Sequence, residues 1–583
     1  MRFVLAIVLF VVAFVSMGLG IAQRTFLAGP SKVNESVVVD STAPFTIIDG
    51  STLNAHDGTQ SLSVSGTDGV FVAYGRTVDV MAWVGEAGYT ELSTPKDPES
   101  TEFKAETVNG SETEVPNPAG SDLWIQEFTS ESQLTRKLNV PDDISVIIAS
   151  DGTKPAPTNV SVTWPIDNST PWSGPLLLGG VAALLAGIIA LLWALVHARR
   201  VRGPRRKTPR MPRNPKPPRL KPAPQRRAIE ATDKVGSHGR RRLFVALAGL
   251  SVGAVALAGC STPGAGSGTS PSPSASSVSD ASELESPAVT GPQVKRILMR
   301  VSETLVAADE AKDATAAATR LDGPALELRK ANYVIRTADG AIAAPAPIPT
   351  GSVDVLLPEQ NDGWPRAVFA VVTDANNPTA APTAVVLTQA SPRENYKVHY
   401  TMSLDHDLPK VAPSSIGATK LQNDSKLLLV QPDQLATEYG DVLVKGKESD
   451  YYETFASEGD NLQSALGPEY KAARNAELQP SAVAEFIDAA GPGTVVAFAT
   501  NDSGALVAVD LRENENRRPV EAGAAITSQG EVKALSGKAQ STRGFTTSFA
   551  VQILFYVPPA TAADQKVKVL GFSQGLVSAA EIG

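Results

Sequence analysis

One pentapeptide in this chain has the spacing of a nucleophilic serine site: Gly571-Phe572-Ser573-Gln574-Gly575, which follows the strand-like run KVKVL. The G-x-S-x-G pattern presents a serine on a sharp turn between a strand and a helix, and its acid and histidine partners come later in the chain. No histidine follows Ser573; the five are His56, His197, His238, His399 and His406. We therefore expect a turn after a terminal strand here, and no serine hydrolase.

A second group, Asp405-His406-Asp407, places oxygen and nitrogen atoms side by side, and such atoms are ligands for several metal ions. One short cluster is weak evidence, and the Leu408-Pro409 pair that follows favours a solvated loop. The chain also lacks a P-loop, a dinucleotide-binding fingerprint and a zinc motif. We expect no catalytic residue, no cofactor and no metal, and hence a protein that is not an enzyme.

The third candidate is Cys260, the single cysteine of the chain. One cysteine cannot form an internal disulfide, and iron–sulfur and cysteine-based zinc sites need several thiolates. The sequence LAGC at 257–260 ends the apolar run Leu243–Gly259, which follows three arginines at 240–242. This arrangement resembles a bacterial lipoprotein signal, in which the cysteine receives a diacylglycerol. The resemblance implies lipidation of Cys260; an uncleaved third membrane span is the alternative.

Two longer apolar segments must position these groups relative to a membrane. Phe3–Ala22 and Leu176–Val196 each hold about 20 residues without a charge, enough to cross a hydrocarbon core of about 30 Å. A cleaved signal peptide is the alternative for the first segment. Seventeen Lys and Arg residues lie between 199 and 242, against two acidic residues. The positive-inside rule makes this stretch cytoplasmic, so residues 23–173 and 261–583 are expected outside.

The basic stretch, residues 198–242, is rich in proline, which favours an extended chain. We expect it to contact anionic headgroups, so membrane lipids are predicted partners. Nucleic acid is not expected, because no aromatic residues are interleaved for base stacking. Residues 261–290 form a Ser/Pro/Gly linker that would let a domain stand off from the membrane.

Residues 23–173 contain many short β-type runs separated by Gly, Asp, Asn and Pro. Among them are SVVVD, FTIIDG, SLSVSG, GVFVAYG, LWIQEF, SVIIAS and NVSVTW. In TVDVMAWVG, the residues Val78, Val80, Ala82 and Val84 alternate, which predicts one face of a strand. Short strands with regular turn signals predict an all-β, sandwich-like domain.

Residues 291–583 have the order helix, then strands, twice over. The apolar residues Val294, Ile297, Leu298, Val301 and Leu305 have helical spacing, and the strand-like runs AVFAVVTD, TAVVLTQA and NYKVHYTMSL follow. A second helical stretch with a Gly-Pro pair precedes TVVAFATN, ALVAVDLR, FAVQILFYV and KVKVLGFS. We predict an α+β region of two units, 291–440 and 441–583. By element order alone, each resembles a cystatin-like or nuclear-transport-factor-2-like fold.

The predicted organisation is a multidomain membrane protein. Its segments are 1–22 (transmembrane helix or signal anchor), 23–173 (β-rich domain), 174–197 (transmembrane helix), 198–242 (cytoplasmic loop), 243–260 (transmembrane helix or internal lipoprotein signal), 261–290 (linker), and 291–440 and 441–583 (α+β units). A β-rich domain, WPIDNSTPWSGPLLLGG before a span, a basic Pro-rich loop, an internal LAGC and an Ala-rich α+β tail resemble actinobacterial membrane proteins of unknown function. The resemblance implies a Gram-positive source and a cell-surface location, and it supplies no catalytic residues.

The expected function is a non-enzymatic binding or scaffold role on the outer face of the cytoplasmic membrane, with an envelope protein or the cell wall as partner. Two alternatives are an envelope enzyme, such as a hydrolase with an unrecognised site, and a ligand sensor. The basic stretch contains neither a kinase nor a DNA-binding domain, which counts against the sensor.

Overall fold

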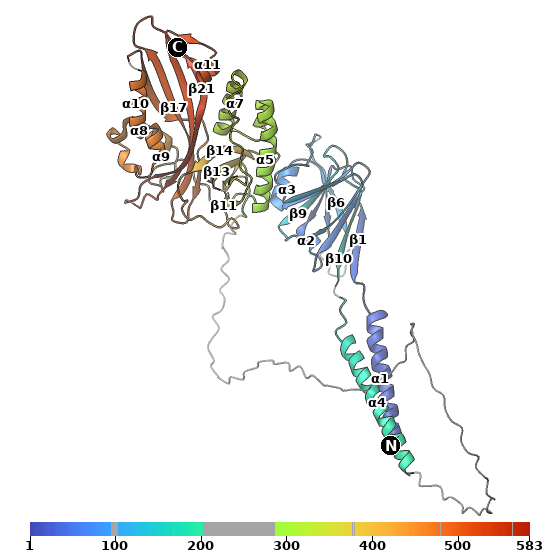
Figure 1. Cartoon of the computed structure of the whole chain (residues 1–583). Helices are drawn as coiled ribbons and strands as arrows, with labels where there is room; N and C mark the ends of the chain where they lie inside the picture. Colours follow the sequence, from blue (N-terminus) through green and yellow to red (C-terminus); the bar gives the residue numbers. More distant parts are fainter. Residues whose placement is uncertain are drawn as a thin grey trace, which may run out of the picture. The chain divides into compact units, whose positions relative to one another are not determined.

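The structure is a computed structural model that describes residues 1–94, 103–112, 114–166, 168–201, 286–375, 377, 379–478, 480–562 and 564–583. The chain divides into two compact units. The first contains the helices α1 (Arg2–Thr25) and α4 (Ser173–Val201), and the second contains residues 26–170 and 286–583 (Figure 1). Within the second unit, we call residues 26–170 the β domain and residues 286–583 the C-terminal domain. The predicted segments 202–242 and 243–260, with Cys260, lie outside the described residues.

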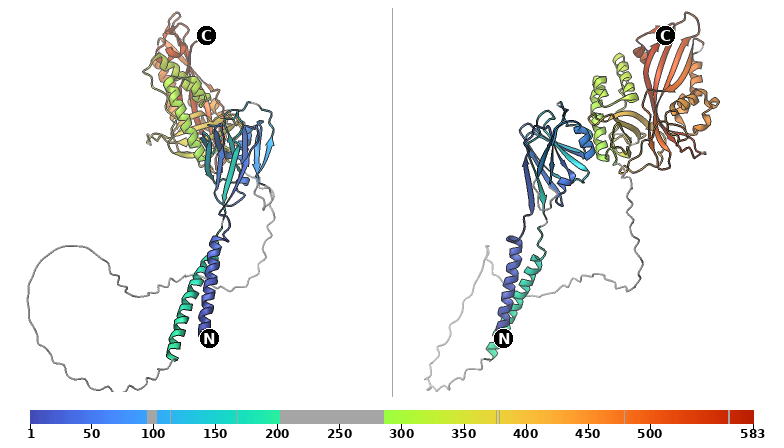
Figure 2. Two further views of the ribbon diagram at one scale, coloured as in Figure 1. Left: turned by 90° about the vertical axis from the view of Figure 1, so that its right-hand side faces the viewer. Right: turned by 180° about the vertical axis from the view of Figure 1, so that it is seen from behind.

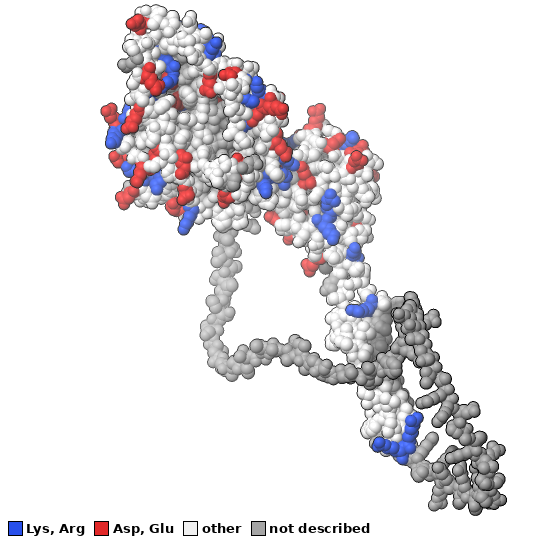
Figure 3. Space-filling model, in the orientation of Figure 1, with Lys and Arg blue, Asp and Glu red and all other residues white. Residues whose placement is uncertain are grey.

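The first unit is a pair of helices that lie side by side in every view (Figures 1 and 2). Both helices are long and apolar enough to cross a membrane, as predicted from the two uncharged segments. On the face shown in Figure 3, their surface is white except near the helix ends, where basic side chains lie. Arg199 and Arg200 are in the last turn of α4. Helices with exposed apolar side chains on most sides favour a lipid environment.

Small residues hold these two helices close together. Ala6, Ala13 and Gly20 follow one another at intervals of seven residues, and both alanines are buried. A Cβ atom added to Gly180 would lie 3.0 Å from the amide nitrogen of Met17 and 3.1 Å from the carbonyl oxygen of Ala13. The backbones thus approach too closely for any larger residue at position 180. Small residues at such contacts are typical of helix pairs in membranes.

The β domain contains ten strands and two short helices among its described residues. They are β1 (Lys32–Val38), β2 (Phe45–Asp49), α2 (Gly50–Leu53), β3 (Gln60–Ser65), β4 (Val70–Arg76), α3 (Thr77–Val84), β5 (Tyr89–Ser93), β6 (Lys104–Val108), β7 (Gln126–Ser130), β8 (Gln133–Leu138), β9 (Ile144–Ala149) and β10 (Asn159–Pro165). The strands form two sheets, β1-β10-β3-β8 and β6-β5-β2-β9-β4-β7. The β-rich character that we predicted for residues 23–173 is confirmed.

The two sheets share one hydrophobic core. Along β3, Leu62 and Val64 alternate with half-buried serines, and both contribute to the same cluster as Val72 and Ile148 of the other sheet. Trp164 of β10 also lies in this cluster, and its indole nitrogen donates a hydrogen bond of 2.6 Å to the Leu53 carbonyl. Alternation of buried and exposed side chains thus directs each sheet toward the other.

The run TVDVMAWV forms a helix, α3, and the strand that we predicted there is wrong. Val80 and Val84 are one helical turn apart, so they satisfy both a period of two and a period of 3.6. Asp79 and Trp83 are buried beside them, and in a strand these odd-numbered residues would point to the opposite face. The buried tryptophan is thus the signal that favours the helix.

The C-terminal domain mixes helices and strands, as predicted. Its helices are α5 (Gly291–Ala311), α6 (Ala314–Ala318), α7 (Gly323–Ala338), α8 (Leu435–Lys445), α9 (Asn461–Leu466), α10 (Pro468–Leu478) and α11 (Gly530–Ser536). Its strands are β11 (Val353–Pro358), β12 (Arg366–Val372), β13 (Thr383–Gln389), β14 (Lys397–Leu404), β15 (Ala482–Ala490), β16 (Val496–Ala499), β17 (Ala505–Pro519), β18 (Ile526–Thr527), β19 (Gln540–Ser541), β20 (Phe545–Val557) and β21 (Lys568–Glu581).

Strands from both predicted units form one sheet, in the order β11-β12-β13-β14-β21-β20-β17-β15, with β16 paired to β17. The sheet therefore has no boundary at residue 440, where we predicted one between 291–440 and 441–583. Each half keeps its own helix layer, α5 to α7 over the first strands and α8 with α9 over the later ones. A third cluster joins the halves, because Phe369 and Tyr400 share it with Phe498 and Leu554. The likeness of each half to the two named folds stays a prediction.

Candidate functional site

The serine motif lies inside a strand, so neither a nucleophile elbow nor the turn that we predicted exists there. Residues 571–575 belong to β21, and Ser573 pairs with Gln552 of β20. A Cβ atom at Gly571 would lie 2.2 Å from the carbonyl oxygen of Ser403. Glycine at position 571 thus permits the close approach of β21 to β14.

Ser573 does line a cavity of about 690 Å³ between α7, residues 345–349 and the sheet. Its lining mixes polar residues, such as Thr401, Ser403 and Arg329, with apolar ones, such as Leu328 and Ile335. No histidine is among the residues that line it. A mixed lining of this kind suits a small molecule with both polar and apolar groups.

Asp405-His406-Asp407 lies in a loop, as predicted. The backbone amides of Asp405 and His406 donate to the Leu570 carbonyl at 2.9 and 3.1 Å. Within the described residues, no group of three or more His, Cys, Asp or Glu side chains could hold a metal ion.

His399 is buried, and both of its ring nitrogens have partners. Nδ1 lies 2.7 Å from the Asp322 carboxylate, and Nε2 accepts a hydrogen bond of 3.1 Å from the Thr494 amide. A nitrogen that accepts from an amide cannot carry a proton, so this arrangement assigns the neutral tautomer with hydrogen on Nδ1. With both nitrogens engaged, His399 joins the two halves of the C-terminal domain and is not free to act as a base.

The most developed polar arrangement joins the β domain to the C-terminal domain. Carboxylates and carbonyl groups of the β domain accept hydrogen bonds from arginines of the C-terminal domain. We divide it into the Asp122 cluster (Asp122, Glu127, Arg300, Arg320), the Asp79 cluster (Arg76, Asp79, Asp362, Arg366) and the Arg393 clamp (Arg393, Glu112, Trp83, Val84).

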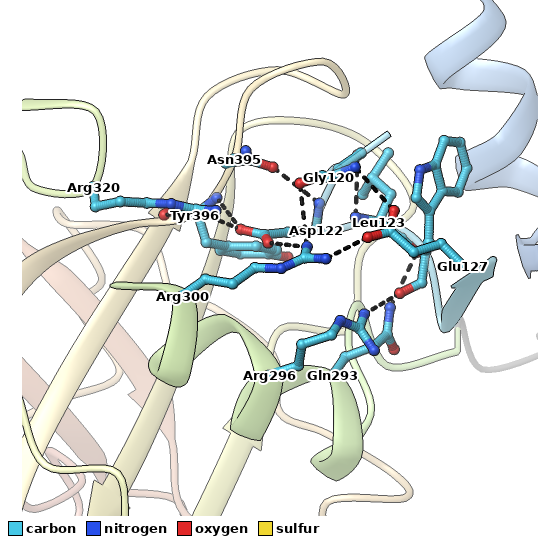
Figure 4. A network of polar contacts seen from close by, with 12 residues as sticks. Gly120, Asp122, Leu123, Glu127, Gln293, Arg296, Arg300, Arg320, Asn395 and Tyr396 are labelled. Atoms are coloured by element: carbon cyan, nitrogen blue, oxygen red, sulfur yellow. Dashed lines mark hydrogen bonds and ion pairs between the residues drawn. The ribbon is translucent and has the colours of Figure 1, made fainter. Parts of the chain in front are cut away.

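The Asp122 cluster has a fully buried carboxylate at its centre (Figure 4). Arg320 Nη1 lies 2.5 Å from Oδ2 of Asp122, and Arg300 Nη1 lies 3.3 Å from Oδ1. The amide of Tyr396 donates to Oδ2 at 3.0 Å, while the amide of Asp122 donates to the Asn395 side chain at 2.9 Å. Arg300 also reaches Glu127 at 2.5 Å. A buried carboxylate with this many donors satisfies the requirement that buried charges be paired.

Helix α5 supplies a polar stripe to the same contact. Gln293, Arg296 and Arg300 recur at helical spacing on the side of α5 away from its buried face of Val294, Ile297 and Val301. Arg296 donates to the carbonyl groups of Trp124 and, at 2.8 Å, of Ile125. The Gln293 amide donates to the Leu123 carbonyl at 3.1 Å. These side chains thus bind backbone carbonyl groups of the β domain directly (Figure 4).

The Asp79 cluster depends on helix α3. Arg76 binds Asp79 with two hydrogen bonds of 2.9 Å and also reaches Asp362 of the C-terminal domain at 2.9 Å. Arg366, whose side chain is fully buried, lies 2.8 Å from Asp79 and stacks on the Trp364 ring with its guanidinium 3.6 Å from the ring centre. Trp364 in turn packs against the aromatic core of the β domain. Charge pairing and apolar packing therefore coincide here.

In the Arg393 clamp, one guanidinium donates hydrogen bonds to four acceptor atoms. Arg393 binds both oxygens of Glu112, at 2.5 and 2.7 Å, and donates to the carbonyl groups of Trp83 and Val84 at 2.8 Å each. The fork of the guanidinium matches a carboxylate with two parallel bonds. The hydrogen bonds from Arg393 hold the pKa of Glu112 below its ordinary value.

Burial changes the properties of other groups at this contact. Burial raises the pKa of Tyr396, whose hydroxyl has no hydrogen-bond partner in the described structure. Burial lowers the pKa of Arg296, and neighbouring Arg300 lowers it further. For Arg76, burial acts to lower the pKa, but the hydrogen bonds and charge of Asp79 outweigh it and the net pKa is raised.

The sequence did not lead us to this interface. Its residues lie far apart, with Asp122 and Arg320 separated by 198 positions. The one local signal was the spacing of Gln293, Arg296 and Arg300, which gives α5 a second, charged face beside its apolar one.

The described structure is thus a two-domain body with a charged interface, together with a pair of apolar helices. The chain belongs to the family described as "Domain of unknown function (DUF8094)", which matches residues 285–581, slightly more than half of the 583 residues. The match covers the C-terminal domain and agrees with our prediction of a family of unknown function. Searches of curated proteins and of solved structures find no match.

Proposed function

We propose that this chain is a non-enzymatic scaffold of the cell envelope, in which the β domain holds the C-terminal domain on the outer face of the cytoplasmic membrane. The observation that carries the proposal is the Asp122 cluster. This cluster joins the β domain to the C-terminal domain. The β domain lies between α1 and α4 in the chain, and the C-terminal domain is the part that matches the family. A buried carboxylate with several fixed donors is suited to holding surfaces together.

The chain path supports this placement. Strand β1 begins seven residues after α1 ends, β10 ends eight residues before α4 begins, and the two strands pair with each other. If both helices span the membrane, residues 26–170, which follow α1 and precede α4 in the chain, lie on one side of it. The basic residues Arg2, Arg199 and Arg200 lie at the opposite ends of the helices, which favours the cytoplasm for that side.

Cysteine labelling tests the placement. In a Cys260→Ser chain without native cysteines, Lys137→Cys in the β domain and Lys447→Cys in the C-terminal domain each introduce one exposed thiol. We expect a membrane-impermeant maleimide to label both in intact cells and to label a Lys216→Cys chain only after lysis. Labelling of position 447 only after lysis would refute the proposal.

Lipidation of Cys260 belongs to the same proposal, because LAGC and the preceding arginines resemble a lipoprotein signal of a Gram-positive, actinobacterial kind. We expect intact-mass analysis of native membranes to detect a C-terminal product that carries a diacylglycerol adduct. A Cys260→Ser chain should lose this product. A species of 60.9 kDa without an acyl adduct would contradict lipidation.

The cavity beside α7 favours a second candidate, a ligand-binding role for the C-terminal domain. Its lining of hydroxyl groups and apolar side chains suits a small amphipathic molecule, and the charged Arg329 in this lining is already bound to Asp309. Glu531, at the edge of this cavity, is exposed. A detergent-like probe, such as an uncharged alkyl glucoside, should bind the native chain, and Leu328→Trp should prevent binding by filling the cavity.

A further inference from the structure

The contacts between the two domains have the character of recognition between separate partners. On the C-terminal side the charged donors are all arginines: Arg296, Arg300, Arg320, Arg366 and Arg393. On the β-domain side the charged acceptors are all carboxylates: Asp79, Glu112, Asp122 and Glu127. Arg76 of the β domain with Asp362 of the C-terminal domain forms a pair of the opposite sense. The prevailing arrangement, arginines on one surface and carboxylates on the other, orients two surfaces before they meet and rejects wrong partners.

Main-chain and aromatic contacts add specificity to these charges. Arginines and Gln293 of the C-terminal domain donate to backbone carbonyl groups of the β domain, which lie at Trp83, Val84, Gly120, Leu123, Trp124 and Ile125. Trp364 packs against the β-domain core as an aromatic anchor. Arginine and tryptophan are the residues on which binding energy at protein interfaces concentrates.

None of these contacts requires a covalent connection between the domains. The partners in the β domain lie between Arg76 and Glu127, and those in the C-terminal domain lie between Ser286 and Tyr396. Residues 128–285, which include α4, separate the two sets along the chain. If lipoprotein processing cuts the chain before Cys260, the interface alone can keep the products together.

We propose that the β domain is a receptor for the C-terminal domain as a separate polypeptide, so that the two products form a stable non-covalent pair. This inference rests on the proposed function in one respect, because lipoprotein processing at Cys260 would produce the two separate polypeptides. The affinity of the two domains for each other does not depend on that processing. The partner is defined chemically: a surface of arginines around a tryptophan. It is presented by α5, by the turn between α6 and α7 that carries Arg320, and by residues at or just before the starts of β12 and β14.

An inserted protease site tests binding without natural processing. The full-length Cys260→Ser chain receives a specific protease sequence after Ser277 and is purified in detergent. After cleavage, we expect the two fragments to elute as one complex at 0.15 M salt. Asp122→Asn leaves Arg300 and Arg320 without their buried counter-charge, so we expect the cut variant to dissociate roughly a hundredfold faster or more.

Three controls accompany this measurement and separate binding from folding. Tyr396→Phe removes a buried hydroxyl without a partner at the same place, and the cut chain should stay associated. The uncut Asp122→Asn chain should elute as a folded monomer, because the covalent connection keeps the domains at high effective concentration. Lys566→Ala, which breaks an exposed ion pair with Glu453, should have no effect on association.

If the fragments of the cut parent chain, which has no substitution at the interface, elute separately, the inference is overturned. Retention of the Asp122→Asn fragments with the same dissociation rate as the parent would also overturn it. Neither result depends on the side of the membrane, which the labelling experiment measures separately. A wrong topology would therefore refute the proposed function and leave this measurement unaffected.

Discussion

Individual charges contribute unequally to this structure. Exposed pairs such as Lys566 with Glu453 contribute little to the stability of a fold, because water and salt screen their charges. Asp122 is different because its side chain is fully buried, and removal of one partner of such a pair costs about 3 to 5 kcal/mol. The interface thus depends on a few residues, and most other surface charges of the described chain can change without consequence.

Tyr396 is a buried polar residue whose hydroxyl, unlike the Asp122 carboxylate, can be removed without loss of stability. Its hydroxyl is buried without a hydrogen-bond partner in the described structure, so it bears the cost of lost hydration. We expect Tyr396→Phe to change the free energy of unfolding by about 0 to 1 kcal/mol in the stabilising direction. The thermal midpoint should therefore stay the same or rise. Differential scanning calorimetry of the full chain measures this. A loss above about 2 kcal/mol would show that the hydroxyl has a partner.

Asp488 predicts a pH dependence. Lys471 lies between Asp488 at 3.1 Å and Glu513 at 2.9 Å, and burial raises the pKa of Asp488 from 3.8 to about 6. A carboxyl with a raised native pKa contributes stability below its unfolded pKa and loses it as pH rises through the native pKa. We therefore expect the free energy of unfolding of the C-terminal domain to fall by on the order of 1 to 3 kcal/mol as pH rises from 4 to 7, because Asp488 ionises in this range.

The Asp488→Asn variant should remove that part of the pH dependence, because the amide does not ionise. Urea unfolding at pH 5 and at pH 7 measures the difference. Glu453→Gln makes the same change at an exposed position, where the hydrogen bond from Lys566 lowers the pKa, so it should leave this window unchanged. An Asp488→Asn chain with the parent's full pH dependence would show that other carboxylates, such as Glu513, are responsible.

At this scale the sequence predicted what is local. It placed Asp405-His406-Asp407 in a loop, which the structure confirms, and it predicted a turn at Ser573, where the structure has strand β21. It could not assign meaning to Asp122, because a lone aspartate carries no signal of burial. Only the fold brings Arg300 and Arg320 to it.

Among the elements, regular amphipathic helices and strands were predictable. Helix α5 has the buried residues that its spacing indicated, and the runs named for β12, β13 and β14 form those strands. Helix α3 was missed because the turn from Val80 to Val84 fits two periods. Strand β15 was missed because its buried residues, Ala482 and Ala484, are small and give weak contrast with their exposed neighbours.

The helix pair gives a prediction with a neighbouring control. A Cβ at Gly187 would lie 3.4 Å from the Cβ of Leu9, close to the spacing found in disulfides. In a Cys260→Ser chain, Leu9→Cys with Gly187→Cys should therefore form a disulfide on mild oxidation, seen as a linked peptide by mass spectrometry. Adding Gly180→Leu should reduce its yield severalfold, because position 180 has no room for a side chain.

Gly179→Leu is the matched control, since a Cβ at Gly179 meets nothing within 4 Å. It should leave the disulfide yield unchanged. Detection of the link also requires that α1 remain in the mature protein, which tests the alternative of a cleaved signal peptide. An equal loss for both leucine variants would contradict the assigned face of α4.

For the whole molecule, the sequence predicted the order of the parts and not how they join. Two apolar segments, a β-rich region and an α+β region occur in the predicted order. The two repeats of helix and strands suggested two units, but β14 pairs with β21, with Ser403 opposite Phe572, and makes one sheet. Such long-range pairing leaves no local trace, because its cost and gain depend on the complete fold. The interface between domains is unpredictable for the same reason.

The central claim is that buried carboxylate–arginine contacts hold the C-terminal domain on the β domain. A double-mutant cycle on the cut chain measures it most directly, with Asp122→Asn, Arg320→Met and the double variant, and the dissociation constant of the fragments as readout. We predict a coupling free energy of at least about 1.5 kcal/mol between the two residues, as measured for close charge pairs at other interfaces. A coupling below about 0.5 kcal/mol, with additive single effects, would contradict the claim.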